Sequence, residues 1–176
     1  MTKILSADTT SETCSISIFD KYDLVGNINS KIERSHSKLL LRMIDNLLKK
    51  YSLNINDIDA FSISKGPGSY TGLRIGVSSF KGLCYALDKP LISINSLDLL
   101  SRIAKSKIEK KKYFMCPMVD ARRMEVYTKL LDNDFNIMIE DCAMILDEKS
   151  FRDYNSELIY FFGSGSEKFS EIIENK

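Results

Sequence analysis

Two polar segments of this sequence contain the residue types that phosphate-binding and metal-binding sites use. The first is DTTSET, residues 8–13, a turn between two apolar runs that supplies Asp8 and Thr10. An aspartate in such a turn can hold magnesium beside a phosphate, but a glycine is then needed to admit the phosphate, and this turn has none. Hydroxyl side chains also bond to the backbone of their own turn. We therefore favour a self-capped turn over a nucleotide-binding one.

The second segment is KGPGSYTGLRIG, residues 65–76, which is rich in glycine and leads into an expected helix. It does not form the phosphate loop GxxxxGK[ST], because Leu73 and Arg74 follow Gly72, and it does not fit GxGxxG. Backbone amides at a helix start could still bind an anion. We favour a tight turn that lets two backbones approach. The residues concerned are Gly66, Pro67, Gly68, Ser69, Tyr70, Thr71 and Gly72.

Three other features restrict the chemistry. His36 is the only histidine, which excludes an HxxxH metal site. The four cysteines are far apart without CxxC pairing, so neither a zinc site nor a redox pair of the usual spacing is expected. No GxSxG segment supplies a hydrolase nucleophile. His36 stands at an expected helix start, where it would cap the helix or contact a partner.

Basic residues occur at two places where they could contact a phosphate backbone. Arg122 and Arg123 lie beside Asp120 and Glu125 in VDARRMEVY. Such arginines can grip phosphate, although neighbouring opposite charges more often neutralise one another. The lysine-rich run at residues 105–112 could touch RNA, but a solvated linker is the default expectation.

Strand-like and helical patterns alternate along the chain and would position these segments. The expected strands are residues 3–7, 14–19, 24–28, 60–64, 91–95, 114–119, 124–131, 135–141 and 158–162; the expected helices are 36–51, 71–87 and 96–107. This order predicts an α/β fold. The change in composition at the lysine run predicts two domains, an N-terminal one at 1–104 and a shorter, strand-rich one at 105–176.

Composition argues against several classes of protein. The net charge of the 176 residues is +1, so no global field draws the chain to nucleic acid or membranes. No apolar run approaches the roughly 20 residues that span a bilayer, and Asp8 interrupts the stretch that a signal peptide would need. We expect a cytoplasmic, reduced protein without a membrane partner.

The expected helix at 71–87 has an unusual outer face. Opposite its core residues lie Ile75, Ser78, Ser79 and Gly82, with Arg74 on a narrow charged strip. Small residues in a stripe let another backbone approach closely. The expected helix at 36–51 also carries apolar residues beyond the roughly 100° stripe that one core contact requires. Both helices could pack against a partner, or the second domain of the chain could cover them.

The ordered segments resemble a known family. ILSADTTSETCSISIF, RSHSKLLLRMID, SKGPGSYTGLRIGVSSFKGLCYAL, PLISINSLDLLS and VDARRMEVY together resemble the bacterial TsaB family, also called YeaZ and once labelled glycoprotease-like. The resemblance runs from residue 4 to about residue 130, with a weaker echo at FFGSGSEKF. Typical relatives continue past this last segment, so a shortened second lobe is expected.

The resemblance implies a fold of the actin-like ATPase (ASKHA) superfamily, with two ferredoxin-hydrolase-like lobes and mixed sheets. It implies a non-catalytic subunit that pairs with TsaD, the transferase that attaches threonylcarbamoyl to N6 of adenosine 37 in tRNAs reading ANN codons. The small ATPase TsaE would complete the assembly, and the chain alone would form a homodimer. tRNA would be contacted through the complex. No metal or cofactor of its own is implied, with ATP or ADP entering only at the complex interface.

The resemblance also implies that the two long helices form the dimer surface. The expected contact residues are His36, Leu40, Met43, Leu47, Arg74, Ile75, Ser78, Ser79 and Gly82. Two functions of other classes compete with the scaffold: a glycoprotease-like peptidase or hydrolase, and an ATP-binding regulator that uses Asp8 and the glycine-rich loop.

Overall fold

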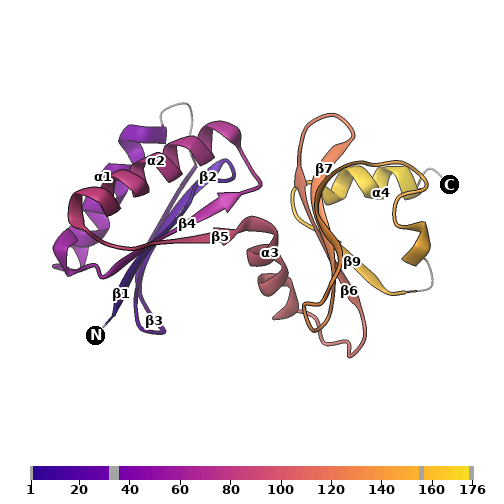
Figure 1. The fold of residues 1–176 in the computed structure, drawn as a ribbon, viewed down its shortest axis with the longest axis horizontal. Helices are drawn as coiled ribbons and strands as arrows, with labels where there is room; N and C mark the ends of the chain where they lie inside the picture. Colours follow the sequence, from indigo (N-terminus) through magenta and orange to yellow (C-terminus); the bar gives the residue numbers. More distant parts are fainter. Residues whose placement is uncertain (1, 32–35, 155–156, 175–176) are drawn as a thin grey trace. The chain divides into compact units, whose positions relative to one another are not determined.

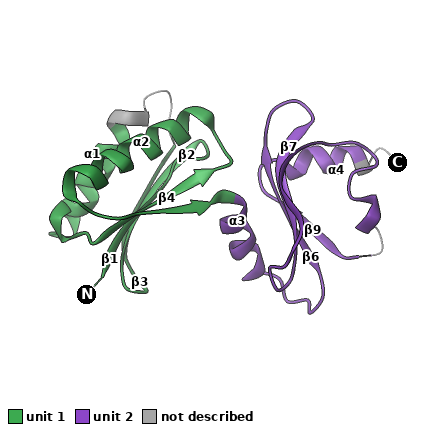
Figure 2. Cartoon of the chain, in the orientation of Figure 1, with its two compact units in different colours: residues 1–96 green, residues 97–176 purple. Residues whose placement is uncertain are grey.

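The computed structural model describes residues 2–31, 36–154 and 157–174. The chain forms two compact units, residues 1–96 and 97–176 (Figures 1 and 2). The sequence placed this division after residue 104. In the structure the helix that begins at Ser96 belongs to the second unit from Leu97 onward, and its Asp98 pairs with Lys129 of that unit, as described below.

The first unit is a five-stranded mixed sheet with two long helices. Its elements are β1 (Lys3–Asp8), β2 (Thr13–Asp20), β3 (Asp23–Lys31), α1 (His36–Lys50), η1 (Ile55–Asp57), β4 (Ala60–Gly66), α2 (Tyr70–Leu87) and β5 (Leu91–Asn95). The strand order is β3-β2-β1-β4-β5. β1, β2 and β3 form an antiparallel meander, whereas β4 runs parallel to β1 and β5 runs parallel to β4.

The core of the first unit lies between this sheet and the helices α1 and α2, which cover one of its faces (Figure 1). Alternate strand residues such as Leu5 and Ile16 are fully buried there, as the period-2 pattern of a strand requires. α1 adds Leu40 and Leu47. Burial of such an aliphatic side chain stabilises the fold by about 1.5–3 kcal/mol.

The second unit is a four-stranded mixed sheet. Its elements are α3 (Ser96–Lys105, whose first residue closes the first unit), β6 (Phe114–Asp120), β7 (Glu125–Asp132), β8 (Ile137–Ile145), η2 (Arg152–Tyr154), β9 (Ile159–Phe162) and α4 (Ser166–Glu174). The order is β8-β7-β6-β9, with β9 parallel to β6 and the other pairs antiparallel. Its main core combines buried residues of the strands, such as Met118 and Val126, with an aromatic cluster in which Phe151, Phe161 and Phe169 are in mutual ring contact.

The predicted α/β fold with two mixed sheets is confirmed, and each predicted strand and helix has its counterpart. α4 was not predicted: it is short, and its apolar pattern rests on few residues, among them Phe169 and Ile172. Among the described residues, no helix is long and apolar enough to cross a membrane.

Candidate functional site

The carboxylate of Asp8, at the end of β1, is the centre of the first candidate site. Its Oδ1 accepts hydrogen bonds from the backbone N–H of Thr10 at 2.8 Å and from the Thr10 hydroxyl at 2.7 Å. Its Oδ2 accepts a third from the hydroxyl of Ser64 on β4 at 2.6 Å. Both oxygens are therefore engaged by the protein itself. This is the self-capped turn that the sequence favoured.

The turn after Asp8 is docked on the glycine-rich loop and on α2. Thr9 is buried, at 1% exposure, and its hydroxyl donates to the carbonyl of Gly72 at 2.8 Å. The backbone N–H of Ser69 donates to the carbonyl of Thr10 at 2.7 Å. These contacts join residues that are about sixty positions apart in the chain, so they hold β1, β4 and α2 in one arrangement.

The glycines of the loop are required for this approach. A Cβ on Gly72 would lie 1.9 Å from the carbonyl oxygen of Thr9, and one on Gly68 would lie 2.5 Å from Cβ of Thr10. Real Cβ atoms do not come this close to other heavy atoms. Gly66 adopts a left-handed φ of 105°, which other residues rarely adopt. The backbone of the turn thus lies in direct contact with the glycine-rich loop, which no side chain larger than hydrogen at these positions would allow.

The first turn of α2 is capped by the residue that precedes it. Ser69 is its N-cap, and its hydroxyl accepts from the N–H of Gly72 at 3.3 Å. The N–H of Leu73 donates to the carbonyl of Ser69 at 2.8 Å. The guanidinium of Arg74 lies over the exposed ring of Tyr70, 4.0 Å from its centre. Thr71 is exposed and Pro67 is half-buried beside them.

The residues predicted to contact a partner divide into two groups. Leu40, Met43 and Leu47 are buried in the core of the first unit, at 0%, 4% and 0% exposure, and so cannot present side chains to a partner. They leave the expected contact surface, because they form the core-facing stripe of α1, whereas Leu41 on the same helix is 49% exposed. His36 begins α1, but its side chain lies outside the described residues.

The α2 residues are nearer the surface. Arg74, Ser78 and Gly82 are exposed, while Ile75 and Ser79 are half-buried. A Cβ built on Gly82 would meet no other atom within 4 Å, in contrast to Gly72 on the same helix. Gly82 and the neighbouring Tyr85, which is 92% exposed, form a surface that the first unit does not cover.

The second unit contains a related turn at Asp120. Its Oδ1 accepts from the backbone N–H of Arg122 at 2.6 Å and lies 2.5 Å from Nζ of Lys168. The hydrogen bond from Lys168, followed by that from Arg122, lowers the pKa of Asp120. The carboxylate is thus neutralised by Lys168 of α4, a pair that no sequence pattern indicated.

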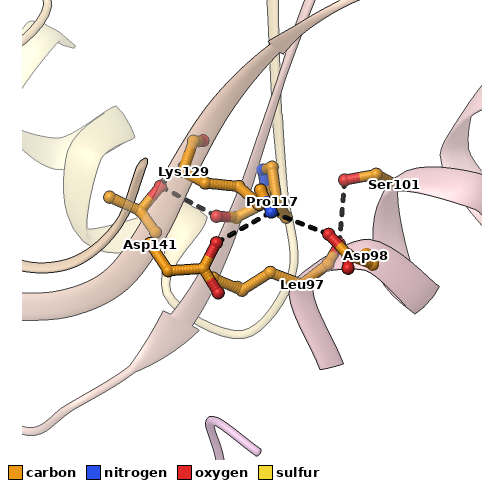
Figure 3. Close-up of polar contacts among 7 residues, drawn as sticks. Leu97, Asp98, Ser101, Pro117, Lys129 and Asp141 are labelled. Atoms are coloured by element: carbon orange, nitrogen blue, oxygen red, sulfur yellow. Dashed lines mark hydrogen bonds and ion pairs between the residues drawn. The ribbon is translucent and has the colours of Figure 1, made fainter. Parts of the chain in front are cut away.

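A buried lysine forms a site that the sequence did not reveal. Nζ of Lys129 on β7 lies 2.7 Å from Asp98 Oδ1 of α3 and 2.7 Å from Asp141 Oδ1 of β8 (Figure 3). Burial lowers the pKa of Lys129, but the hydrogen bonds to Asp141 and Asp98 outweigh it, so the net shift is upward. A charged residue inside the apolar run VYTKLL was the available signal.

No metal site of the usual kind is present in the described parts of the chain, where no three His, Cys, Asp or Glu side chains gather to hold an ion. The cysteines Cys14, Cys84, Cys116 and Cys142 are free thiols. Burial, with a contribution from the nearby Asp8, raises the pKa of Cys14 to about 11, so this thiol is poorly nucleophilic.

Comparison with known proteins identifies the family to which the chain belongs. Residues 15–156 match the family model of TsaD, tRNA N6-adenosine threonylcarbamoyltransferase. The chain is 34% identical to the tRNA threonylcarbamoyladenosine biosynthesis protein TsaB of Haemophilus influenzae, over 97% of this chain and 75% of that protein. It is 28% identical to the TsaB of Bacillus subtilis, over 98% of this chain and 75% of that protein.

A solved structure shares the fold. A protein of Pseudomonas aeruginosa, described as similar to the peptidase YeaZ, superposes with a TM-score of 0.76 at 20% identity, over 99% of this chain and 91% of that one. With the matched segments in order along nearly the whole sequence, the chain belongs to the TsaB family of tRNA threonylcarbamoyladenosine biosynthesis proteins.

Proposed function

We propose that the chain acts in the biosynthesis of tRNA threonylcarbamoyladenosine as a non-catalytic subunit that binds TsaD through the outer face of α2. The family assignment supports the pathway, and a cytoplasmic location follows from a tRNA substrate. TsaE would join the assembly, the chain alone would form a homodimer, and tRNA would be reached through the complex.

The hydrogen bonds of Asp8 support the non-catalytic part of the proposal. Both oxygens of Asp8 accept hydrogen bonds from the protein, and the backbone of Thr9 fills the space beside Gly72. Three of the roughly four acceptor sites of this carboxylate are thus taken by protein donors, two on Oδ1 and one on Oδ2. This arrangement favours a structural role for the loop over an ATP-binding role.

The exposed face of α2 carries the partner-binding part. Gly82 is open to solvent, and Ser78 directs its hydroxyl to the backbone of its own helix, where it bonds the carbonyls of Arg74 and Ile75. A helix with a smooth surface at these positions can pack closely against another helix. Tyr85, an exposed aromatic at the same end of α2, is of the type enriched in protein interfaces.

The test is the mass of the chain in solution by light scattering, alone and mixed with TsaD from the same organism. A heterodimer is expected, and Gly82→Arg should prevent it while leaving the chain folded, with a thermal unfolding midpoint no lower than that of the native chain. Tyr22→Arg, in the exposed β2–β3 turn, is the matched control and should leave the heterodimer intact. A monomeric chain in both samples, or a heterodimer that tolerates Gly82→Arg, would overturn the proposed interface.

A further inference from the structure

The lysine-rich run at residues 105–112 has a place in the fold that its composition did not predict. The sequence favoured a solvated linker between two domains. In the structure this run, here called the lysine loop, joins α3 to β6, and the chain from Leu97 onward belongs to one compact unit (Figure 2). The lysine loop is therefore part of the surface of the second unit and does not connect the two units.

The lysine loop is anchored at its start and at its end. The N–H of Lys107 donates to the carbonyl of Ala104 at 2.9 Å, and the N–H of Ile108 donates to that of Lys105 at 3.3 Å, so the loop leaves α3 in a defined turn. The side chain of Ile108 packs on a small core cluster that contains Tyr113, which is 4% exposed and directly follows the loop. These contacts fix the course of the loop on the second unit.

The lysines of the loop differ in what they contact. Nζ of Lys105 lies 4.7 Å from the centre of the Phe135 ring, so this ammonium is used within the unit. Lys107, Lys110 and Lys111 are exposed, and none of the three forms an ion pair with any residue that the structure describes. They are the ammonium groups that a ligand can engage.

The charge of the lysine loop contrasts with that of the rest of the chain. The loop contains five lysines and one glutamate, a net charge of +4, whereas the whole chain has a net charge of +1. Outside the loop the chain is thus net negative. Lys112 is paired with Glu157 at 3.6 Å, which leaves an excess of positive charge at the centre of the loop. Such a local excess attracts a polyanion.

The composition of this surface favours a nucleic-acid backbone over a protein. The cores of protein interfaces are depleted of lysine and enriched in aromatic residues, whereas the loop packs Ile108 inward and exposes ammonium groups. An ammonium is a compact point charge that contacts a phosphate without reading a base. Neighbouring lysines can neutralise several phosphates of one strand and release their counterions.

We propose that the lysine loop binds the phosphate backbone of the tRNA that the complex with TsaD modifies. The contact is independent of sequence, so it adds affinity for tRNA and leaves the choice of adenosine to other parts of the assembly. This inference rests on the proposed function, which supplies tRNA as the polyanion. The lysine loop belongs to the second unit and the α2 face to the first, so variants can alter one without the other.

The test is the triple variant Lys107→Gln/Lys110→Gln/Lys111→Gln in the complex with TsaD. Anisotropy of a fluorescent tRNA transcript with adenosine at position 37 gives the affinity between about 50 and 200 mM salt. The variant should bind at least about tenfold more weakly at about 100 mM salt. The slope of log affinity against log salt should become shallower by about 2, because each lost phosphate contact removes about 0.7–0.9. An affinity and a slope equal to those of the native complex would overturn the proposal.

A matched control separates the position of these lysines from the total charge. Lys21→Gln/Lys31→Gln/Lys149→Gln removes three exposed lysines elsewhere and changes the net charge by the same amount. Its tRNA affinity should stay within about twofold of the native value, because charges farther than a Debye length from the RNA are screened. An equal loss in both triple variants would assign the effect to overall charge and overturn the proposal.

A charge-preserving variant tests the chemistry of the contact. Lys107→Arg/Lys110→Arg/Lys111→Arg should bind tRNA like the native chain, since a guanidinium also bonds to phosphate. A loss as large as that of the glutamine variant would show that the loop does not act through its charge, which contradicts the proposal.

Light scattering on the same samples separates this inference from the proposed function. The glutamine variant should form the heterodimer with TsaD as the native chain does. If the native chain forms no heterodimer, the proposed function and this inference fail together. If the heterodimer is intact and the glutamine variant binds tRNA normally, only the loop contact fails. Loss of TsaE from the assembly with unchanged tRNA affinity would assign the loop to an acidic protein surface and likewise overturn the proposal.

Discussion

The two units share one backbone plan. In each, an antiparallel meander is followed by a strand parallel to its first strand, then by a helix. The parallel strand leads in each case into a glycine of left-handed φ, 105° at Gly66 and 101° at Gly163. The first strand ends in each case at an aspartate, Asp8 or Asp120, that accepts the backbone N–H two residues later. No sequence repeat accompanies this match, so strand order and turn chemistry carry it.

The units differ in what fills the space beside the sheet. The first places the helix α1 between its third and fourth strands and buries aliphatic residues such as Leu40 and Leu47. The described residues between the third and fourth strands of the second unit form the short η2, and three aromatic rings with centroids 4.8–5.4 Å apart pack in its core. Large side chains on a loop and on α4 thus replace a helix.

The strongest test of this difference is removal of one ring. Phe169→Ala should lower the free energy of unfolding by about 3–5 kcal/mol, because it opens a cavity in the small aromatic core. Urea unfolding followed by circular dichroism measures the loss. Ile145→Ala, at an exposed side chain of the same unit, should change it by no more than about 0.5 kcal/mol. A loss below about 1 kcal/mol for Phe169→Ala would show that the aromatic cluster does not replace a helix.

The first unit should depend instead on close backbone packing. Gly72→Ala is expected to cost about 1–3 kcal/mol of stability, since its methyl group would collide with the carbonyl of Thr9. Gly82→Ala, on the same helix with open space around it, should gain up to about 1 kcal/mol from helix propensity. The same unfolding measurement compares the two, and a similar sign for both would contradict the packing role of Gly72.

Periodicity predicted most of the elements, since apolar spacing alone gave helix 36–51 where α1 spans His36–Lys50. The glycines of residues 65–76, without the spacing of a phosphate loop, indicated that this loop serves close packing. These patterns could not identify Thr9 as the contacting residue, because that contact joins distant parts of the chain. They could not identify the pairing of Lys129 with Asp98 and Asp141 for the same reason. The family resemblance, supported by the wide apolar sweep of helix 36–51, assigned Leu40 and Leu47 to a partner, because a sequence pattern does not say which apolar face a sheet will cover.

The turns at Asp8 and Asp120 differ in the charge of the groups that bond to the aspartate. Asp8 is held by neutral donors, whereas Asp120 is paired with Lys168, which lowers its pKa. A lowered pKa means that this pair stabilises the fold above the unfolded value near 3.9. The contribution is lost as pH falls through the folded pKa, and for so exposed a carboxylate it amounts to a fraction of a kcal/mol.

Lys168→Gln should therefore raise the pKa of Asp120, as measured by NMR titration of its carboxyl carbon. Asp132 provides the internal control: its pKa is lowered mainly by hydrogen bonds from Asn136, and it should titrate as in the native chain. An unchanged Asp120 would assign the effect to the turn backbone rather than to α4.

The smallest effect is expected at His36. If the first unit supplies a surface and no reacting group, His36→Ala should leave threonylcarbamoyl transfer by the reconstituted complex with TsaD within about twofold of the native rate. A loss of several orders of magnitude, the cost of removing a general base, would support the hydrolase class instead. Heterodimer formation measured on the same sample separates lost chemistry from lost assembly.

The Lys129 ion pairs join residues that leave the ribosome at different times during synthesis. The first unit is complete once residue 96 has left the ribosome, but α3, at 10 residues, is too short to be stable alone. Lys129 on β7, which pairs with Asp98 of α3, and Asp141 on β8 are synthesised later. At about 5–20 residues per second, the roughly 40 residues from Asp98 to Asp141 take several seconds to translate. During this interval Asp98 of α3 lacks its ion-pair partner, because Lys129 and Asp141 have not yet been synthesised.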